Sequence, residues 1–131
     1  MKSRMAAVTA SVIIGSTQAS AHHTVARSYD VSHAVALTGI VTSIEWQNPH
    51  VIYHLAARGE PGTSGDWEIE SRHPQGMRLD GIEMDTIKAG DVVTMNVLVA
   101  LDGSHRAATA SVRLPDGRTV RICTVTENKC P

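Results

Sequence analysis

Histidines at two places in the chain have the types and spacing that suit metal chemistry. His22 and His23 follow Ala21 directly, and His50 ends the segment Trp46-Gln47-Asn48-Pro49-His50. If the chain is cut after Ala21, the new terminal amine and Nδ1 of His22 can close a six-membered chelate ring on one ion. Among the divalent first-row metals, nitrogen ligands favour Cu(II) most. The pattern predicts a copper-type site that needs a further imidazole from elsewhere in the fold.

The start of the chain has the pattern of a secretory signal peptide, residues 1–21. A basic start precedes an apolar run from Met5 to Ile14, which is too short to span a bilayer. Ala19 and Ala21 supply the small residues that a signal peptidase requires at positions −3 and −1. We therefore expect a secreted or periplasmic protein of a Gram-negative bacterium whose first mature residue is His22.

The terminal chelate would depend on pH. An α-amine titrates near pH 8 and an imidazole near 6.5, so metal affinity should fall as the pH drops. Thr24 stands in the third mature position, where a histidine would complete the amino-terminal copper chelate. His23, in the second position, is a weaker ligand candidate. The alternative is that His22 and His23 only begin a polar arm.

The segment around Pro49 is expected to form the corner between the first two strands. Proline cannot continue a central ladder, and Asn48 can cap a turn through its side chain. His50 would then begin a strand near the barrel rim, with either a structural or a ligand role. Trp46 is expected to pack over the end of the barrel, with stacking on a ligand as the alternative.

The other histidines are separated from this corner to different degrees. His54 shares a strand face with His50, but four residues of a strand span about 13 Å, so the two cannot bind one ion. His73 follows the third strand and could approach the same rim as a reserve ligand. His33 and His105 are expected to be solvated.

Catalysis is not favoured by the remaining patterns. Glu68 and Glu70 alternate on one strand, which could indicate glycosidase chemistry but fits a solvated strand face better. The sequence has no nucleophile elbow, phosphate-binding glycine loop or H-E-x-x-H helix. A copper oxygenase with a histidine brace would need a flat aromatic surface, and the chain has two Trp, two Tyr and no Phe.

Composition limits the chain to one small domain and restricts its partners. Lys2 and Arg4 are the charged residues of the leader, so processing leaves 10 basic and 13 acidic side chains, a net charge of about −3. A nucleic acid or an anionic membrane is therefore an unfavourable partner. Cys123 and Cys130 are expected to form a disulfide in an oxidising compartment, with a pair of free or metal-binding thiols as the alternative.

The expected organisation is an arm at 22–33, a β domain at 34–122 and a tail at 123–131. Dense β-branched segments predict strands at about 35–44, 50–57, 67–71, 92–101, 107–114 and 118–122, and the segment 74–88 fits one or two short helical turns. Gly39 indicates a bulge or sharp bend in the first strand. Three strands, a helical connection and two or three strands predict an all-β fold, a small OB-like Greek-key barrel. The inward residues expected on the fourth and fifth strands are Val93, Met95, Val97, Val99, Leu101, Ala108, Ala110, Val112 and Leu114.

Several of these motifs occur together in an order that is characteristic of one family. They are Ala21-His22-His23-Thr24, Tyr29-Asp30, Leu37-Thr38-Gly39-x-Val41, Trp46-x-Asn48-Pro49-His50, Gly90-Asp91-Val92-Val93 and Val112-Arg113-Leu114-Pro115-Asp116-Gly117-Arg118. With them the chain resembles a family of small secreted proteobacterial proteins of unknown function, which begin AHHS and carry a W-x-N-P-H corner. Thr24 replaces the usual Ser, and Ile82 stands where a Trp is common. The resemblance implies a fold and a location, without an activity.

The sequence thus favours a periplasmic, non-catalytic binding module. Its ligand would be a metal ion of the copper type or a small molecule, held at the rim by His22 and His50, with His23 and His73 in reserve. The alternative is an envelope protein-interaction or structural module that binds no metal.

Overall fold

The computed structural model describes residues 25–122. Their elements, in chain order, are α1 (Val25–Ser28), β1 (Val35–Glu45), β2 (Ile52–Arg58), β3 (Gly65–Glu70), α2 (Pro74–Leu79), β4 (Val92–Val99), β5 (Arg106–Arg113) and β6 (Thr119–Arg121). The mainly-β class predicted from the sequence is confirmed. No helix within residues 25–122 is long and apolar enough to cross a membrane. The predicted leader and the two cysteines lie outside the described residues.

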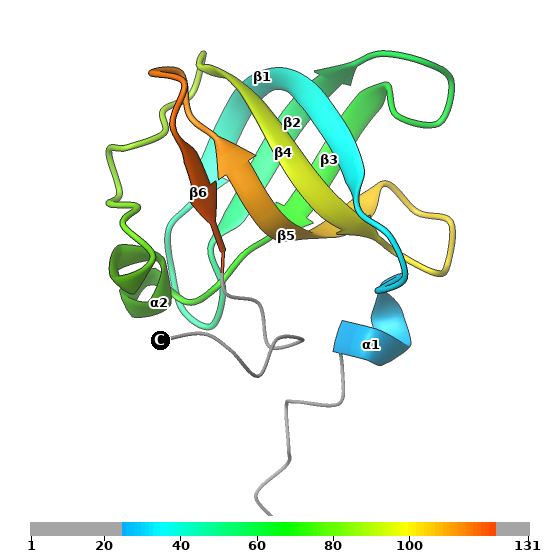
Figure 1. The fold of residues 1–131 in the computed structure, drawn as a ribbon, viewed down its shortest axis with the longest axis horizontal. Helices are drawn as coiled ribbons and strands as arrows, with labels where there is room; N and C mark the ends of the chain where they lie inside the picture. Colours follow the sequence, from blue (N-terminus) through cyan, green and yellow to red (C-terminus); the bar gives the residue numbers. More distant parts are fainter. Residues whose placement is uncertain (1–24, 123–131) are drawn as a thin grey trace, which may run out of the picture.

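Five of the strands close into a barrel (Figure 1). The sheet order is β3-β2-β1-β4-β5-β6, and a parallel pairing of β3 with β5 completes the circle. The long strand β1 pairs with β4 through its first half and with β2 over most of its length. This order, with the helical connection between β3 and β4, is that of the predicted OB-like Greek key. β6 is an additional strand on the outer edge of β5.

Gly39 allows β1 to bend sharply enough to pair on both sides. A Cβ atom at this position would lie 2.7 Å from Cα of Ala57 and closer still to the carbonyl of Ala56. Only glycine permits this approach of two backbones. A bulge follows between Val41 and Ser43, where the register with β2 shifts. The predicted bend or bulge in this strand is confirmed.

The inward faces expected for β4 and β5 need correction at one end. A bulge between Asn96 and Val97 shifts the register of the two strands. Beyond it, Leu98 is buried, Val99 is partly buried and Leu101 is 61% exposed. On β5, Ala108 and Val112 are buried as expected, but Ala107 and Thr109 are buried as well and Ala110 is only partly buried. An extra residue in a ladder reverses the alternation of side chains, so a strict period of two fails past that point.

The connection between β3 and β4 covers one end of the barrel. Pro74 begins α2, and the helix buries Met77, while Ile82 and Ile87 in the following turns are also fully buried. Leu79 and Met84 are exposed. The short helical connection predicted for this segment is confirmed, with the helix confined to its first six residues.

Candidate functional site

The predicted corner between β1 and β2 is a bend at Asn48 and Pro49, which are joined by a cis peptide bond. Trp46 packs partly buried against the barrel core, and Asn48 and Pro49 are exposed. After the corner, the N–H of Val51 donates to the carbonyl of Arg72, and the N–H of Ser71 donates to the carbonyl of Val51. These bonds place His50 beside the end of β3.

His50 is held there by a carboxylate of β3. Its Nδ1 atom lies 2.7 Å from Oε1 of Glu70, and its side chain is 47% exposed. The other carboxylate oxygen, Oε2, accepts a hydrogen bond of 3.0 Å from the hydroxyl of Tyr29. Glu70 thus joins a histidine of the corner to a tyrosine of the amino-terminal segment.

The amino-terminal segment is fixed to the barrel at Tyr29. Tyr29 forms an isolated bridge with Ala100, and the N–H of Asp30 donates to the carbonyl of Val99. The Tyr29 ring belongs to a small buried cluster with Leu98, Ala100 and Ala108. Leu98 and Ala100, which follow the β4 bulge, therefore form part of the surface that the amino-terminal segment covers.

Burial and charge act together on the Tyr29 hydroxyl. Desolvation, and after it the negative charge of Glu70, raises the pKa of Tyr29 to about 12. The phenol therefore stays protonated at neutral pH and remains a donor to the carboxylate.

A second histidine–carboxylate pair lies further along β2. Nε2 of His54 is 2.8 Å from Oε1 of Glu45 on β1. His54 is aligned with Glu68 in the ladder, two places from the Ile52–Glu70 pair. The prediction that His50 and His54 cannot share an ion agrees with their having separate carboxylate partners.

The remaining histidines have different surroundings. His73 is the N-cap of α2, where its Nδ1 accepts a hydrogen bond of 3.2 Å from the N–H of Gly76. His33 is exposed and lies 3.4 Å from a carboxylate oxygen of Asp30. The His105 ring stacks on Trp67 with centroids 4.6 Å apart.

The described part of the chain holds no group of three His, Cys, Asp or Glu residues that could bind a metal ion. His22 and His23, the predicted terminal ligands, and the predicted Cys123–Cys130 disulfide lie outside the described residues. Of the predicted site residues, the structure brings His50 to the barrel rim and gives His73 a capping contact.

Sequence reasoning missed the residues that orient His50. Glu70 looked like part of a solvated strand face, and Tyr29 was noted only within a family motif. A signal was available in both cases. Tyr29 is one of two tyrosines in a chain poor in aromatics, and Glu70 lies two residues after Glu68 on the outward face of a strand that antiparallel pairing brings next to His50.

Comparison with known proteins identifies a family for this chain. Neither the curated proteins nor the solved structures contain a match to this chain. A family of unknown function, DUF6152, matches residues 9–109, which include the corner, His50, Glu70 and Tyr29. With more than three quarters of its length matched, the chain belongs to this family of unknown function, DUF6152.

Proposed function

We propose that the protein is an exported, non-catalytic binding module that holds a Cu(II)-type metal ion between the mature amino terminus at His22 and the imidazole of His50. Export to the periplasm is part of the proposal because it creates the terminal amine of His22. The contact that carries the proposal is the pairing of Nδ1 of His50 with Glu70.

This pairing orients the neutral ring of His50 for a metal ion. A carboxylate at 2.7 Å accepts the Nδ1–H proton, so the Nε2 atom of the neutral ring carries the free lone pair. Metal-ligating histidines characteristically donate their second ring nitrogen to a carboxylate in this way, which fixes the ring and raises its basicity. The half-exposed side chain of His50 leaves room for an ion and further ligands.

The chain after His22 is anchored beside the same carboxylate. The Tyr29 hydroxyl binds Glu70, so the arm is fixed one side chain away from His50. His22 precedes Tyr29 by seven residues, of which Val25–Ser28 form α1, so the span is at most about 20 Å. The terminal amine and the first imidazole are therefore within chain reach of His50, and together they would supply three nitrogen ligands.

His73 is less suited to this role than His50. Its Nδ1 accepts the N–H of Gly76, so the neutral ring carries its proton on Nε2. Binding a metal through either nitrogen would require breaking the helix cap or changing the tautomer. We therefore assign the metal-ligand role to His50 and a helix-capping role to His73.

The test is a Cu(II) competition titration at neutral pH with processed protein that begins at His22. His54→Ala is the matched control for His50→Ala, because both histidines project from the β2 side of the barrel and pair with a carboxylate. Glu70→Gln should weaken binding about 10–100-fold, and His50→Ala by more than that. His54→Ala should leave the affinity unchanged.

One further variant separates the two parts of the site. An alanine added ahead of His22 displaces the terminal amine and should also weaken binding strongly. Affinity that is indifferent to the added residue and to His50→Ala would refute the proposal and favour the alternative, an envelope interaction module without a metal.

A further inference from the structure

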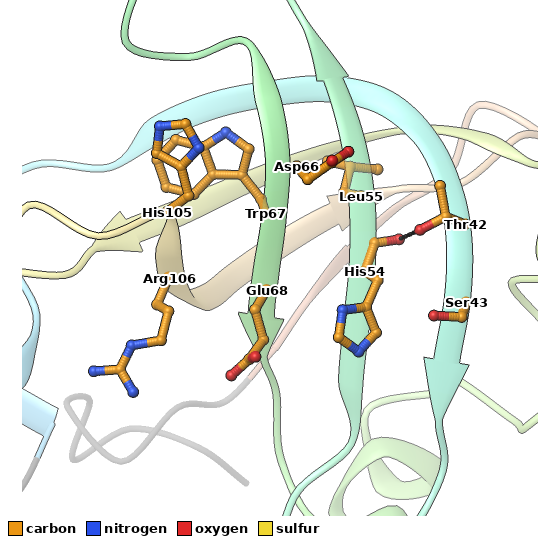
Figure 2. A pocket seen from close by; sticks show the side chains of 9 residues that line it. All are labelled: Thr42, Ser43, His54, Leu55, Asp66, Trp67, Glu68, His105 and Arg106. Carbon is orange, nitrogen blue, oxygen red and sulfur yellow. Dashed lines mark hydrogen bonds between the residues drawn. The ribbon is translucent and has the colours of Figure 1, made fainter.

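A groove of about 560 Å³ lies on the outer face of the barrel, apart from the His50 corner. It runs across β1, β2 and β3 to the start of β5, and its walls include the end of the β4–β5 loop (Figure 2). OB barrels bind oligonucleotides and oligosaccharides on the face of β2 and β3 with this same loop. The position of the groove therefore indicates a ligand site, and the side chains decide between the two classes of ligand.

The charges in the groove oppose an anionic ligand. Asp66 and Glu68 both face it from β3, and Glu45 lies next to it in its pair with His54. Arg106 is the one Lys or Arg in the lining, and its guanidinium lies 3.4 Å from a carboxylate oxygen of Asp102. Because nucleic acids bind chiefly through cations placed on their phosphates, an oligonucleotide does not fit. Neither does a phosphorylated or carboxylated sugar.

The polar groups that are available fit a ligand rich in hydroxyls. Within residues 25–122, the carboxylates of Asp66 and Glu68 have no hydrogen-bond or ion-pair partner, and an ionised carboxylate can only accept. Donors also line the groove, namely the Ser43 hydroxyl and the Arg106 guanidinium. Figure 2 shows Ser43, His54 and Glu68 projecting from three adjacent strands, with Arg106 beside Glu68. A sugar hydroxyl, which both donates and accepts, can bond to either kind of group.

One end of the groove presents a flat ring. His105 stacks on Trp67 with an angle of 7° between the ring planes, and Trp67 itself is only 3% exposed (Figure 2). The outer face of His105 is therefore backed by a fixed aromatic ring, and it offers an apolar surface to the C–H groups of a sugar. Nε1 of Trp67 is buried and has no hydrogen-bond partner among the described residues.

We propose that this groove binds a neutral oligosaccharide. The hydroxyls of the sugar donate to Asp66 and Glu68 and accept from Arg106, and one ring packs on the exposed face of His105. The volume suits a ligand of several hundred cubic ångströms, within the usual range of small-molecule sites. None of these residues forms a hydrogen bond with His50 or Tyr29, so binding in the groove can be tested separately from metal binding.

The test is an NMR titration of the ¹⁵N-labelled processed protein with cellotetraose, maltotetraose and N-acetylchitotetraose. Each is taken to about 10 mM, tenfold above a Kd of about 1 mM. The chain has two tryptophans, and both indole N–H groups are buried without a partner in the described residues. The indole N–H signal of Trp67 should shift in a saturable way with at least one saccharide. The corresponding signal of Trp46, a residue outside the groove, should not shift.

Variants separate binding in the groove from binding elsewhere. Glu68→Ala and His105→Ala should each lower the affinity about tenfold, as expected when a hydrogen bond to a charged group or a ring contact is lost. Asp85→Ala, an exposed acid in the connection between α2 and β4, is the control and should change nothing. The proposal is overturned if none of the three saccharides shifts the Trp67 signal, if the control variant loses as much affinity as Glu68→Ala, or if trigalacturonate, an acidic sugar, binds better than the neutral ones.

Discussion

The hydrogen bond between Tyr29 and Glu70 should contribute measurably to the stability of the barrel. Tyr29→Phe removes only the hydroxyl and keeps the ring that packs on Leu98, Ala100 and Ala108. A hydrogen bond to a charged group contributes about 1.5–3 kcal/mol. Because the Glu70 side chain is 33% exposed, water can replace part of this contact, and we expect a loss of about 1–1.5 kcal/mol.

Thermal unfolding of the processed protein measures this loss. For a domain of this size, 1 kcal/mol corresponds to a fall in Tm of about 4–8 °C. A double-mutant cycle with Glu70→Gln isolates the pair, and we expect a coupling energy of about 0.5 kcal/mol or more. If Tyr29→Phe leaves the free energy of unfolding unchanged, or if the two losses simply add, the Tyr29 hydroxyl does not hold the arm on Glu70. His22 would then not be held near His50.

Three further predictions concern the barrel itself. Gly39→Ala should destabilise the protein by about 1–3 kcal/mol or prevent folding, because its Cβ would overlap the backbone of β2. Thermal unfolding measures the loss, and Gly103→Ala is the control, because Gly103 has a positive φ but no atom within 4 Å of an added Cβ. The ultraviolet difference spectrum should show no tyrosinate near pH 10 in the folded protein, because burial raises the pKa of both Tyr29 and Tyr53. Because the folded pKa lies above the unfolded value, the stabilisation that comes from keeping the tyrosines protonated is fully present below pH 10 and is lost as the pH rises toward 12. A tyrosinate signal from folded protein near pH 10 would contradict the burial of both rings. His73→Ala should cost about 0.5–1 kcal/mol through the lost helix cap, and a Cu(II) affinity that falls with it would instead assign His73 to the metal site.

Much of the architecture could be predicted because it depends on local patterns. Dense β-branched segments gave all six strands, and Gly39 marked the bend of β1. The order of strands around one helical connection was enough to indicate an OB-like barrel. What failed was the face of β4 and β5 beyond the bulge at Asn96, because one extra residue inverts the alternation and no residue type marks it.

Only one residue of the candidate site, His50, could be predicted from the sequence, for a related reason. His50 stands out in a short motif, whereas Glu70 lies 20 residues after it and Tyr29 lies 21 residues before it, and the three meet through tertiary packing. Glu70 has the same local pattern as any acid on a solvated strand face. Its role depends on the antiparallel register with β2, which the sequence does not encode in any single segment.

Paramagnetic broadening tests the central claim most directly. Cu(II) is added in less than one equivalent to the ¹⁵N-labelled processed protein, and the amide signals that disappear mark the position of the ion. The proposed site predicts selective loss around Tyr29, Val51 and Glu70, while the signals at the opposite ends of β2 and β3, near Ala57 and Gly65, persist. Broadening confined to the residues after His22, or centred on another histidine, would contradict a site shared between the amino terminus and His50.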